Sequence, residues 1–410
     1  MTESRPDAEV GPWLAAHARP VAVPDDDADG LEDGVAAWVR AVGDARVVAL
    51  GPTVAGTTEL TRLAGRILDG LVEDPVHGGV HGGGVRTLAL QTSESATTTL
   101  DDQVRRGAVS ADALDVLGSW SWNTRDVLDL VRRLAEQPDP VRVIGIDPRK
   151  PAGAVGTVGR FLRTAAPDVL PSVAERLAEL ALGHGDDGTR TAVEQVRARL
   201  DRDAPDLVAA TSLEEYTDAV RQARFLARAA ELAAAPASGA DAVAARLMAE
   251  IVLEALDASG PEGRLVLWAH ADHVVVRDEP PTLGAHLREH LGEAYRALLL
   301  TAGTGTARAV RRRRLFGPAR TPSTHRLGTP PDDGLEAVLL GAVPRDHVLD
   351  LRVPDVPPAV TAWAESDVPR RSVGDEVSAA STARTVVPCR PGVEADGVAV
   401  VGTVHPARVR

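Results

Sequence analysis

Five runs of mostly apolar residues recur along the chain, and turn or polar residues follow each of them. They occupy residues 46–50, 86–90, 141–146, 265–269 and 296–301. Short apolar runs of this kind are typical of strands that are buried on both faces, as in a parallel sheet. Two further runs, at 347–351 and 397–401, predict the last strands. The pattern therefore predicts one mostly parallel sheet.

Helical periodicity fills the spaces between these runs. Apolar residues three and four positions apart follow the first strand from Leu60 to Leu71 and recur between Leu283 and Leu291, which predicts helices with one buried stripe. Asn123 predicts the N-cap of another helix. Strands that alternate with helices indicate an α/β fold, a mostly parallel sheet flanked by helices.

These patterns divide the chain into four parts. Residues 1–33 are polar and rich in aspartate and proline, so we expect a loosely ordered N-terminal arm. Residues 34–151 and 259–410 carry the strand patterns and predict the first and second parts of the α/β core. Residues 152–258 carry only helical periodicity and predict a helical insertion that covers one side of the sheet.

Two histidines and a carboxylate follow the apolar run at 265–269: His270, Asp272 and His273. In an open α/β sheet, ligands bind in the crevice beyond the carboxyl ends of the strands. A histidine that a carboxylate orients is a credible general base, so His270 and His273 are the candidate catalytic residues. The alternative interpretation is structural: His270 caps the strand by hydrogen bonding and His273 packs in a loop.

Three other motifs give weaker evidence for a functional site. The loop after the first strand has two glycines at the spacing of a phosphate-binding loop. However, Thr57 stands where that loop needs lysine, and Pro52 lacks a backbone N–H, which argues against nucleotide binding. The glycine-rich segment 77–84 lacks the G-x-S-x-G elbow of lipases, so we interpret it as a variable loop. We interpret the basic run Arg311–Arg314 as a solvated loop.

Charge and composition narrow the classes of protein further. A net charge of −14 argues against general nucleic-acid binding. Lys150 is the one lysine, which confines lysine-based catalysis to that position. The single Cys389 cannot form an internal disulfide and suits a reducing compartment. Because the chain shows no apolar leader and no membrane-spanning run, we expect a cytoplasmic protein. We also expect no metal and no cofactor.

Taken together, the order and spacing of six segments resemble the erythromycin esterase family, whose enzymes open macrolide lactones by hydrolysis. The resemblance covers roughly residues 35–405, and no one segment is specific alone. The segments are 48–59, 120–127, 143–147, 267–274, 282–288 and 334–338. The resemblance implies a hydrolase family related to macrolide resistance, with a ligand cleft at the carboxyl edge of the sheet.

The resemblance also implies which site residues are kept and which are lost. The family's first loop reads approximately L-G-E-x-x-H-G-T-x-E, where this chain has L-G-P-T-V-A-G-T-T-E. Pro52 therefore stands at the family's glutamate and Ala55 at its histidine, and Gln91 holds the place of a second glutamate. A family arginine falls at Ala64. Both His270 and His273 are retained, as are Glu59 and the segment that contains Trp122.

These losses predict a change of function. Proline and alanine cannot accept a proton, and Gln91 can hydrogen bond but cannot ionise. Loss of a positioned general acid or base typically lowers the reaction rate by a factor of about 10²–10⁴. We therefore expect a catalytically degenerate homologue that keeps a cleft for an apolar lactone-type molecule, with the residues at the ligand being Glu59, Gln91, Trp122 and Asp272.

Two alternatives of a different class stay open. One is an active hydrolase of an ester or lactone that uses His270 and His273 with nearby carboxylates. The other is a structural or partner-binding role. A carboxylate within hydrogen-bond reach of either histidine would favour chemistry, and the sequence offers Asp272, Glu94 and Asp147 for that role. We further predict that one crevice brings together Pro52, Ala55, Gln91, His270 and His273.

Overall fold

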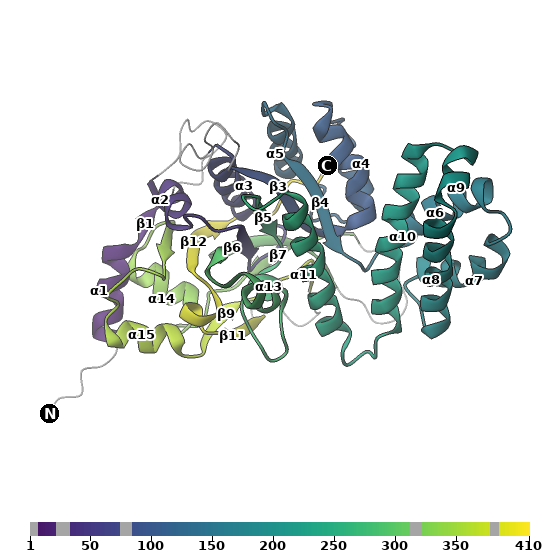
Figure 1. The fold of residues 1–410 in the computed structure, drawn as a ribbon. Helices are drawn as coiled ribbons and strands as arrows, with labels where there is room; N and C mark the ends of the chain where they lie inside the picture. The colour runs from purple at the N-terminus through teal and green to yellow at the C-terminus, as the bar shows by residue number, and fades with distance from the viewer. Residues whose placement is uncertain (1–6, 22–32, 74–83, 312–320, 378–384) are drawn as a thin grey trace.

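The chain folds into a central sheet that is flanked by helices on both faces (Figure 1). A computed structural model describes residues 7–21, 33–73, 84–311, 321–377 and 385–410. Within these ranges, ten strands form one sheet in the order β1-β8-β12-β6-β2-β5-β3-β4, with β7 and β10 beside the long β6. Their bounds are β1 Arg19–Pro20, β2 Val47–Pro52, β3 Val85–Ser93, β4 Arg142–Asp147, β5 Arg264–Trp268, β6 Tyr295–Arg311, β7 Ser323–Leu327, β8 His347–Asp350, β10 Glu376–Val377 and β12 Gly397–Val404. Two further strands, β9 Val368–Arg371 and β11 Val386–Cys389, pair separately.

The five strands predicted from apolar runs are β2 to β6, and all of them pair in parallel. The two predicted last strands are β8 and β12. Of these, β12 runs parallel to β6, and β8 runs antiparallel to β12. The α/β prediction is therefore confirmed.

Alternate residues of the central strand β2 explain why its sequence is apolar throughout. Val48 and Leu50 pack into one buried cluster, whereas Val47 and Ala49 pack into another on the opposite face. A strand buried on both faces has no position left for a polar side chain. The helices that supply these layers include α2 Asp33–Ala41, α3 Thr58–Val72, α4 Glu94–Arg105, α5 Arg125–Glu136, α11 Ala240–Ala258, α12 Ala271–Val274, α13 Leu283–Leu291, α14 Leu335–Ala342, α15 Pro358–Glu365 and α16 Pro391–Glu394.

Between β4 and β5 the chain is helical, as predicted for residues 152–258. The helices are α6 Ala152–Ala165, α7 Leu170–Ala181, α8 Asp187–Arg202, α9 Ala204–Ala210, α10 Leu213–Ala234 and α11. Helices α6 to α10 share a core of their own, and we call them the helical lobe. Helix α11 packs against the sheet instead. The lobe lies at one end of the molecule, beyond α4 and α11 (Figure 1).

Two expectations about local structure were wrong. Residues 7–17, expected to be part of a loose arm, form helix α1 (Asp7–His17), whose Trp13 and Leu14 are buried in a cluster that includes residues of α14 and α15. The N-cap of α5 is Thr124, not Asn123, because the Thr124 hydroxyl accepts a hydrogen bond from the backbone N–H of Val127.

The outer edge of β4, at the end of the sheet order, is covered by side chains of α4. The backbone N–H of Val143 donates to Asp101 at 2.8 Å, and that of Gly145 donates to Thr97 at 2.7 Å. These contacts use two N–H groups that an edge strand would otherwise expose.

Most of the glycine-rich segment 77–84 and of the basic run after Arg311 lies outside the described residues. In the part of the chain that is described, no helix is both long and apolar enough to span a bilayer.

Candidate functional site

A cavity of about 510 Å³ lies at the carboxyl ends of β2, β3 and β5. All five residues that we expected to converge line it, namely Pro52, Ala55, Gln91, His270 and His273. The predicted ligand residues Trp122 and Asp272 line it as well. Trp122 and Trp268 meet edge to face with ring centroids 5.4 Å apart and form an apolar wall, while most other lining residues are polar or charged.

His270 uses one of its ring nitrogens in local structure. Its Nδ1 accepts a hydrogen bond from the backbone N–H of Asp272 at 3.3 Å, which makes His270 the N-cap of the short helix α12. Nε2 is buried and makes no hydrogen bond within the described residues, although the nearby Val373 carbonyl favours the protonated ring. Burial nevertheless lowers the pKa of His270, and Asp272 opposes this only in part. His270 therefore caps the helix α12, whereas the structural interpretation expected it to cap the preceding strand.

Asp272 is the carboxylate closest to a catalytic arrangement. Its Oδ2 lies 3.5 Å from Nδ1 of His270, but the same oxygen accepts from the Ser372 hydroxyl at 2.6 Å. Its Oδ1 accepts from the Arg370 guanidinium at 2.6 Å. Burial alone would raise the pKa of Asp272, yet His270, Arg370 and Ser372 together lower it to about 2. The group is thus ionised and already bonded on both oxygens.

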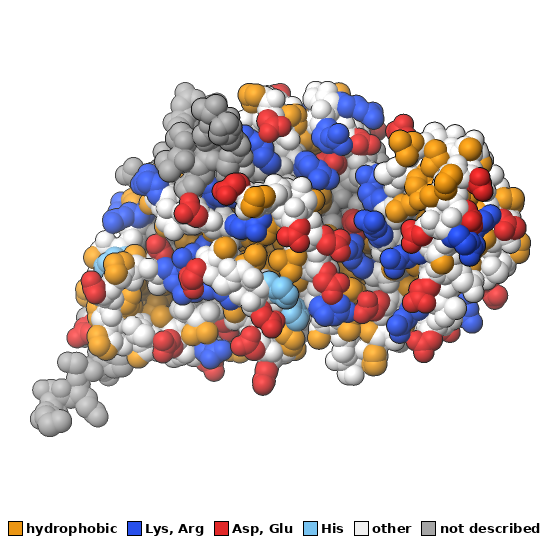
Figure 2. Space-filling model, in the orientation of Figure 1, with side chains coloured by type: hydrophobic (Ala, Val, Ile, Leu, Met, Phe, Trp, Pro, Cys, Tyr) orange, Lys and Arg blue, Asp and Glu red, His pale blue; other side chains and the backbone are white. Residues whose placement is uncertain are grey.

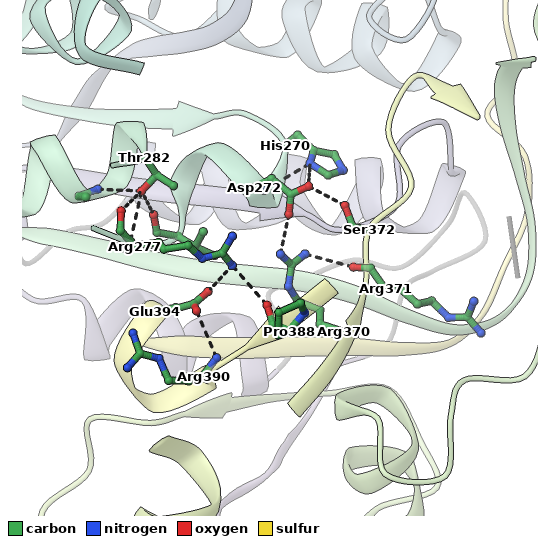
Figure 3. Close-up of polar contacts among 12 residues, drawn as sticks. His270, Asp272, Arg277, Thr282, Arg370, Arg371, Ser372, Pro388, Arg390 and Glu394 are labelled. Carbon is green, nitrogen blue, oxygen red and sulfur yellow. Dashed lines mark hydrogen bonds and ion pairs between the residues drawn. The ribbon is translucent and has the colours of Figure 1, made fainter. Parts of the chain in front are cut away.

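The ion pair with the buried Arg370 fixes the position of the Asp272 carboxylate. The Arg370 side chain is 0% exposed, and its guanidinium also donates to the Arg371 carbonyl at 3.1 Å (Figure 3). The buried Cys389 thiol lies beside it, and burial raises the pKa of Cys389 to about 12, so this neighbour stays neutral. Among the described residues, Asp272 is the carboxylate that forms an ion pair with Arg370.

His273 lines the cavity, and no carboxylate in the described part of the chain forms a hydrogen bond or ion pair with its ring. Burial, together with His270 and Arg149, lowers the pKa of His273 to about 4. The ring is therefore neutral at pH 7 and a weak base. Asp147 lines the same cavity, but it accepts from the Arg149 backbone N–H at 2.9 Å.

The first loop is fixed in place by a distant segment, residues 372–375. The Ala55 N–H donates to the Val373 carbonyl at 2.7 Å, and the Val373 N–H donates to the Thr53 carbonyl at 2.8 Å. Gly56 has a φ of +65°, and a Cβ there would collide with the carbonyl of Arg308. The loop conformation is therefore well defined, although it offers no proton acceptor at positions 52 and 55.

The side chain of Gln91 is hydrogen bonded to the backbone. Its Oε1 accepts from the N–H of His270 at 2.9 Å, and its own carbonyl accepts from the Trp122 indole at 3.1 Å. Gln91 therefore ties β3 to the end of β5 and positions one wall of the cavity.

Sequence reasoning missed a second polar group in the cavity lining, formed by Asp375, Ser121 and Lys150. Asp375 accepts from the Ser121 hydroxyl at 2.7 Å, and Lys150 lies near enough to stabilise its charge. Burial raises the pKa of Asp375, and Ser121, His270 and Lys150 oppose this increase. Lys150 donates to the Gly118 carbonyl at 3.2 Å. Only the uniqueness of Lys150 in the sequence pointed toward this group.

Two carboxylates considered for the site lie elsewhere. Glu59 is absent from the cavity lining, and its carboxylate accepts from both the backbone and the ring of His405 at 2.7 Å. Glu94 pairs with Arg228 in the helical lobe at 3.3 Å. The described residues contain no group of three His, Cys, Asp or Glu side chains placed to hold a metal ion.

Comparison with known proteins places this architecture in a family. A family model described as erythromycin esterase matches residues 80–404, a range that begins after the first loop. No curated protein matches the chain.

Solved structures share the fold over almost the whole chain. A Bacillus cereus protein is 19% identical, with a TM-score of 0.76, over 98% of this chain and 99% of that one. A succinoglycan biosynthesis protein is 15% identical, with a TM-score of 0.77 over the same shares. A mutant of the erythromycin esterase EreC in its open conformation is 15% identical, with a TM-score of 0.66, over 90% of this chain and 94% of that one.

Proposed function

The chain belongs to the erythromycin esterase family, and from this premise we propose that it binds a lactone-type small molecule without hydrolysing it through the first loop. The observation that carries the proposal is that Pro52 and Ala55 face a cavity of about 510 Å³. Such a volume is typical of small-molecule sites. Neither side chain can accept or donate a proton, so the cavity is present without the acid–base groups of the first loop.

Three of the remaining candidates for chemistry make structural hydrogen bonds. His270 caps α12, Gln91 accepts from the His270 backbone, and Asp272 neutralises Arg370. A general base needs a free lone pair directed at the substrate or its water. His273 has a ring without such commitments, but its pKa of about 4 makes it a weak base at neutral pH. This distribution of roles favours binding over turnover.

The lining also suggests how the ligand sits. Trp122 and Trp268 offer apolar surface to a hydrocarbon ring. A polar side of the cavity, formed by Ser121, Lys150 and Asp375, offers hydrogen bonds to carbonyl and hydroxyl oxygens. We therefore propose an apolar lactone-type ligand whose oxygens face this polar side.

One observation favours the alternative of an active hydrolase. The 3.5 Å between Nδ1 of His270 and Oδ2 of Asp272 would suit a tautomer in which Nδ1 carries the proton. In that tautomer Nε2 is free to act as a base. The two functions differ in their dependence on His270, because hydrolysis requires its lone pair and binding does not.

A paired experiment separates the two functions. A panel of lactones is tested for binding by thermal shift and calorimetry, and the same compounds are tested for hydrolysis. We expect compounds that bind without turnover, and Trp122→Ala should weaken binding by about tenfold. Trp363→Ala, which changes a partly buried tryptophan outside the cavity, serves as the control.

The outcomes are distinct. Hydrolysis that His270→Ala abolishes would replace this proposal with the hydrolase alternative. A panel in which no lactone binds, or in which Trp122→Ala and Trp363→Ala behave alike, would remove the lactone site itself.

A further inference from the structure

A second cavity, of about 810 Å³, lies between the helical lobe and the end of the sheet, and neither His270 nor His273 lines it. Its walls are formed by α8 and α10 of the lobe on one side and by α4 on the other, and β4 and α11 form its floor. Five arginines line it, namely Arg142, Arg197, Arg221, Arg224 and Arg228, and we call it the arginine groove. Basic side chains gather over this seam beside α10 (Figure 2).

The groove has four carboxylates, Glu94, Asp101, Glu254 and Asp257, against its five arginines, and none of the four forms an ion pair with Arg197 or Arg224 within the described residues. Glu94 and Glu254 both pair with the same arginine, Arg228. Asp101 accepts from the Val143 N–H at 2.8 Å and lies 3.8 Å from Arg142, beyond hydrogen-bond distance. The internal ion pairs of the groove are therefore concentrated at Arg228.

Arg197 and Arg224 are left available. Both side chains are exposed, and neither forms an ion pair or side-chain hydrogen bond within the ranges that the structure describes. They approach the groove from two different helices, α8 and α10, that pack together. In a chain with a net charge of −14, two uncompensated guanidinium groups beside one cavity form a local attraction for anions.

The floor of the groove is apolar. Ile144 on β4 and Ile251 and Ala255 on α11 line it below the arginines. Ile144 and Ala255 are only partly buried, so they keep surface that a ligand can cover. A small inorganic anion would contact the arginines but leave this surface in water, whereas an anion with an apolar body would use both.

We propose that the arginine groove is a second binding site, for an organic anion that has an apolar body and a phosphate or carboxylate group. Arg197 and Arg224 hold the anionic group, and the isoleucine floor contacts the body. The site is independent of the lactone cavity, because the two cavities share no lining residue.

Calorimetry on the full chain tests the proposal with 1-naphthyl phosphate as the probe. We expect binding that weakens as salt rises. Inorganic phosphate, which lacks the body, and 1-naphthol, which lacks the charge, should each bind at least about tenfold more weakly. Removing both arginines in Arg197→Ala/Arg224→Ala should weaken the probe by roughly 100-fold, about tenfold for each charged contact.

Two further variants give the comparison its control. Arg163→Ala/Arg202→Ala removes two exposed arginines of the helical lobe that do not line the groove, and it should bind like the parent. Arg197→Lys/Arg224→Lys keeps the charge without the planar fork and should retain part of the affinity.

The proposal is overturned if the parent does not bind the probe, or if the two alanine double variants lose affinity equally. Equal binding of 1-naphthol would overturn it too, because the arginines would then contribute nothing. Circular dichroism confirms that each variant is folded, and all four arginines are surface residues whose loss should leave the core intact.

Discussion

Asp272→Ala should destabilise the protein far more than the loss of an ordinary surface carboxylate. The substitution removes the carboxylate that pairs with Arg370 and leaves a guanidinium that is 0% exposed without a counter-ion. Breaking a buried ion pair from one side typically costs about 3–5 kcal/mol, because the other charge stays buried. Asp272 itself is 39% exposed, so water can enter on its side and we expect about 3 kcal/mol.

This free energy translates into a measurable melting shift. An unfolding entropy of about 2.1 cal/mol/K per residue gives, for 410 residues, a decrease in Tm of roughly 3–4 °C. Urea denaturation at pH 7 measures the free energy directly. The matched control is Asp129→Ala, because Asp129 pairs with Arg132 at 3.8 Å and both side chains are exposed. That variant should change stability by less than about 1 kcal/mol.

The pH dependence of stability should change in the same variant. The pKa of Asp272 is lowered to about 2 in the folded protein, from an ordinary value of 3.8. A carboxyl with a lowered pKa contributes stability that is fully present above its unfolded pKa and is lost as the pH falls through the folded pKa. The parent should therefore lose about 1 kcal/mol from this group between about pH 4 and pH 2, after allowance for solvent screening. The variant Asp272→Ala should not show this decrease in stability between about pH 4 and pH 2.

The double variant Asp272→Ala/Arg370→Met decides whether the buried charge is the cause. Replacing both partners removes the uncompensated guanidinium, so stability should return toward that of the parent. If Asp272→Ala is no worse than Asp129→Ala, or if the double variant is less stable than Asp272→Ala, the reasoning about Arg370 is refuted.

Three other outcomes are expected. The triple variant Pro52→Glu/Ala55→His/Gln91→Glu restores the family residues and should hydrolyse lactones faster than the parent in a rate assay. Each single change should do little, because a base and its orienting carboxylate act as a unit. A folded but inactive triple variant would count against a decayed esterase. The ring protons of His273 should not titrate in NMR spectra between pH 5.5 and pH 8, since its pKa is about 4, and a midpoint near 6.5 would contradict its burial. Thr124→Ala should cost about 1 kcal/mol in urea denaturation through the lost N-cap of α5, with Asn123→Ala as the comparison that should cost less.

Local sequence pattern was sufficient for the sheet because its strands are buried on both faces. The runs that became β2 to β6 need apolar residues at nearly every position, and few other structures impose that requirement. The strand pattern also predicted that Gln91 and His270 lie together, since the carboxyl ends of parallel strands share one edge of the sheet.

The parts that sequence reasoning missed depend on contacts between distant segments. Asp375 precedes β10, a strand of two residues whose partner is the far end of β6, so no periodicity marks it. The pairing of Asp272 with Arg370 joins residues almost 100 positions apart. Glu59 has the expected place in the first-loop pattern, but its carboxylate is hydrogen bonded to His405 and does not line the cavity. Val10, Trp13 and Leu14 did carry helical spacing, which the polar composition around them obscured.

The seal on the outer edge of β4 has a consequence for how this fold can diverge. An open edge would offer its N–H groups to a strand from another molecule and invite aggregation. Here Asp101 and Thr97 of α4 close that edge, and the helical lobe takes no part in the closure. These two N–H groups of β4 therefore stay covered whatever the sequence of the lobe, as long as Asp101 and Thr97 are kept.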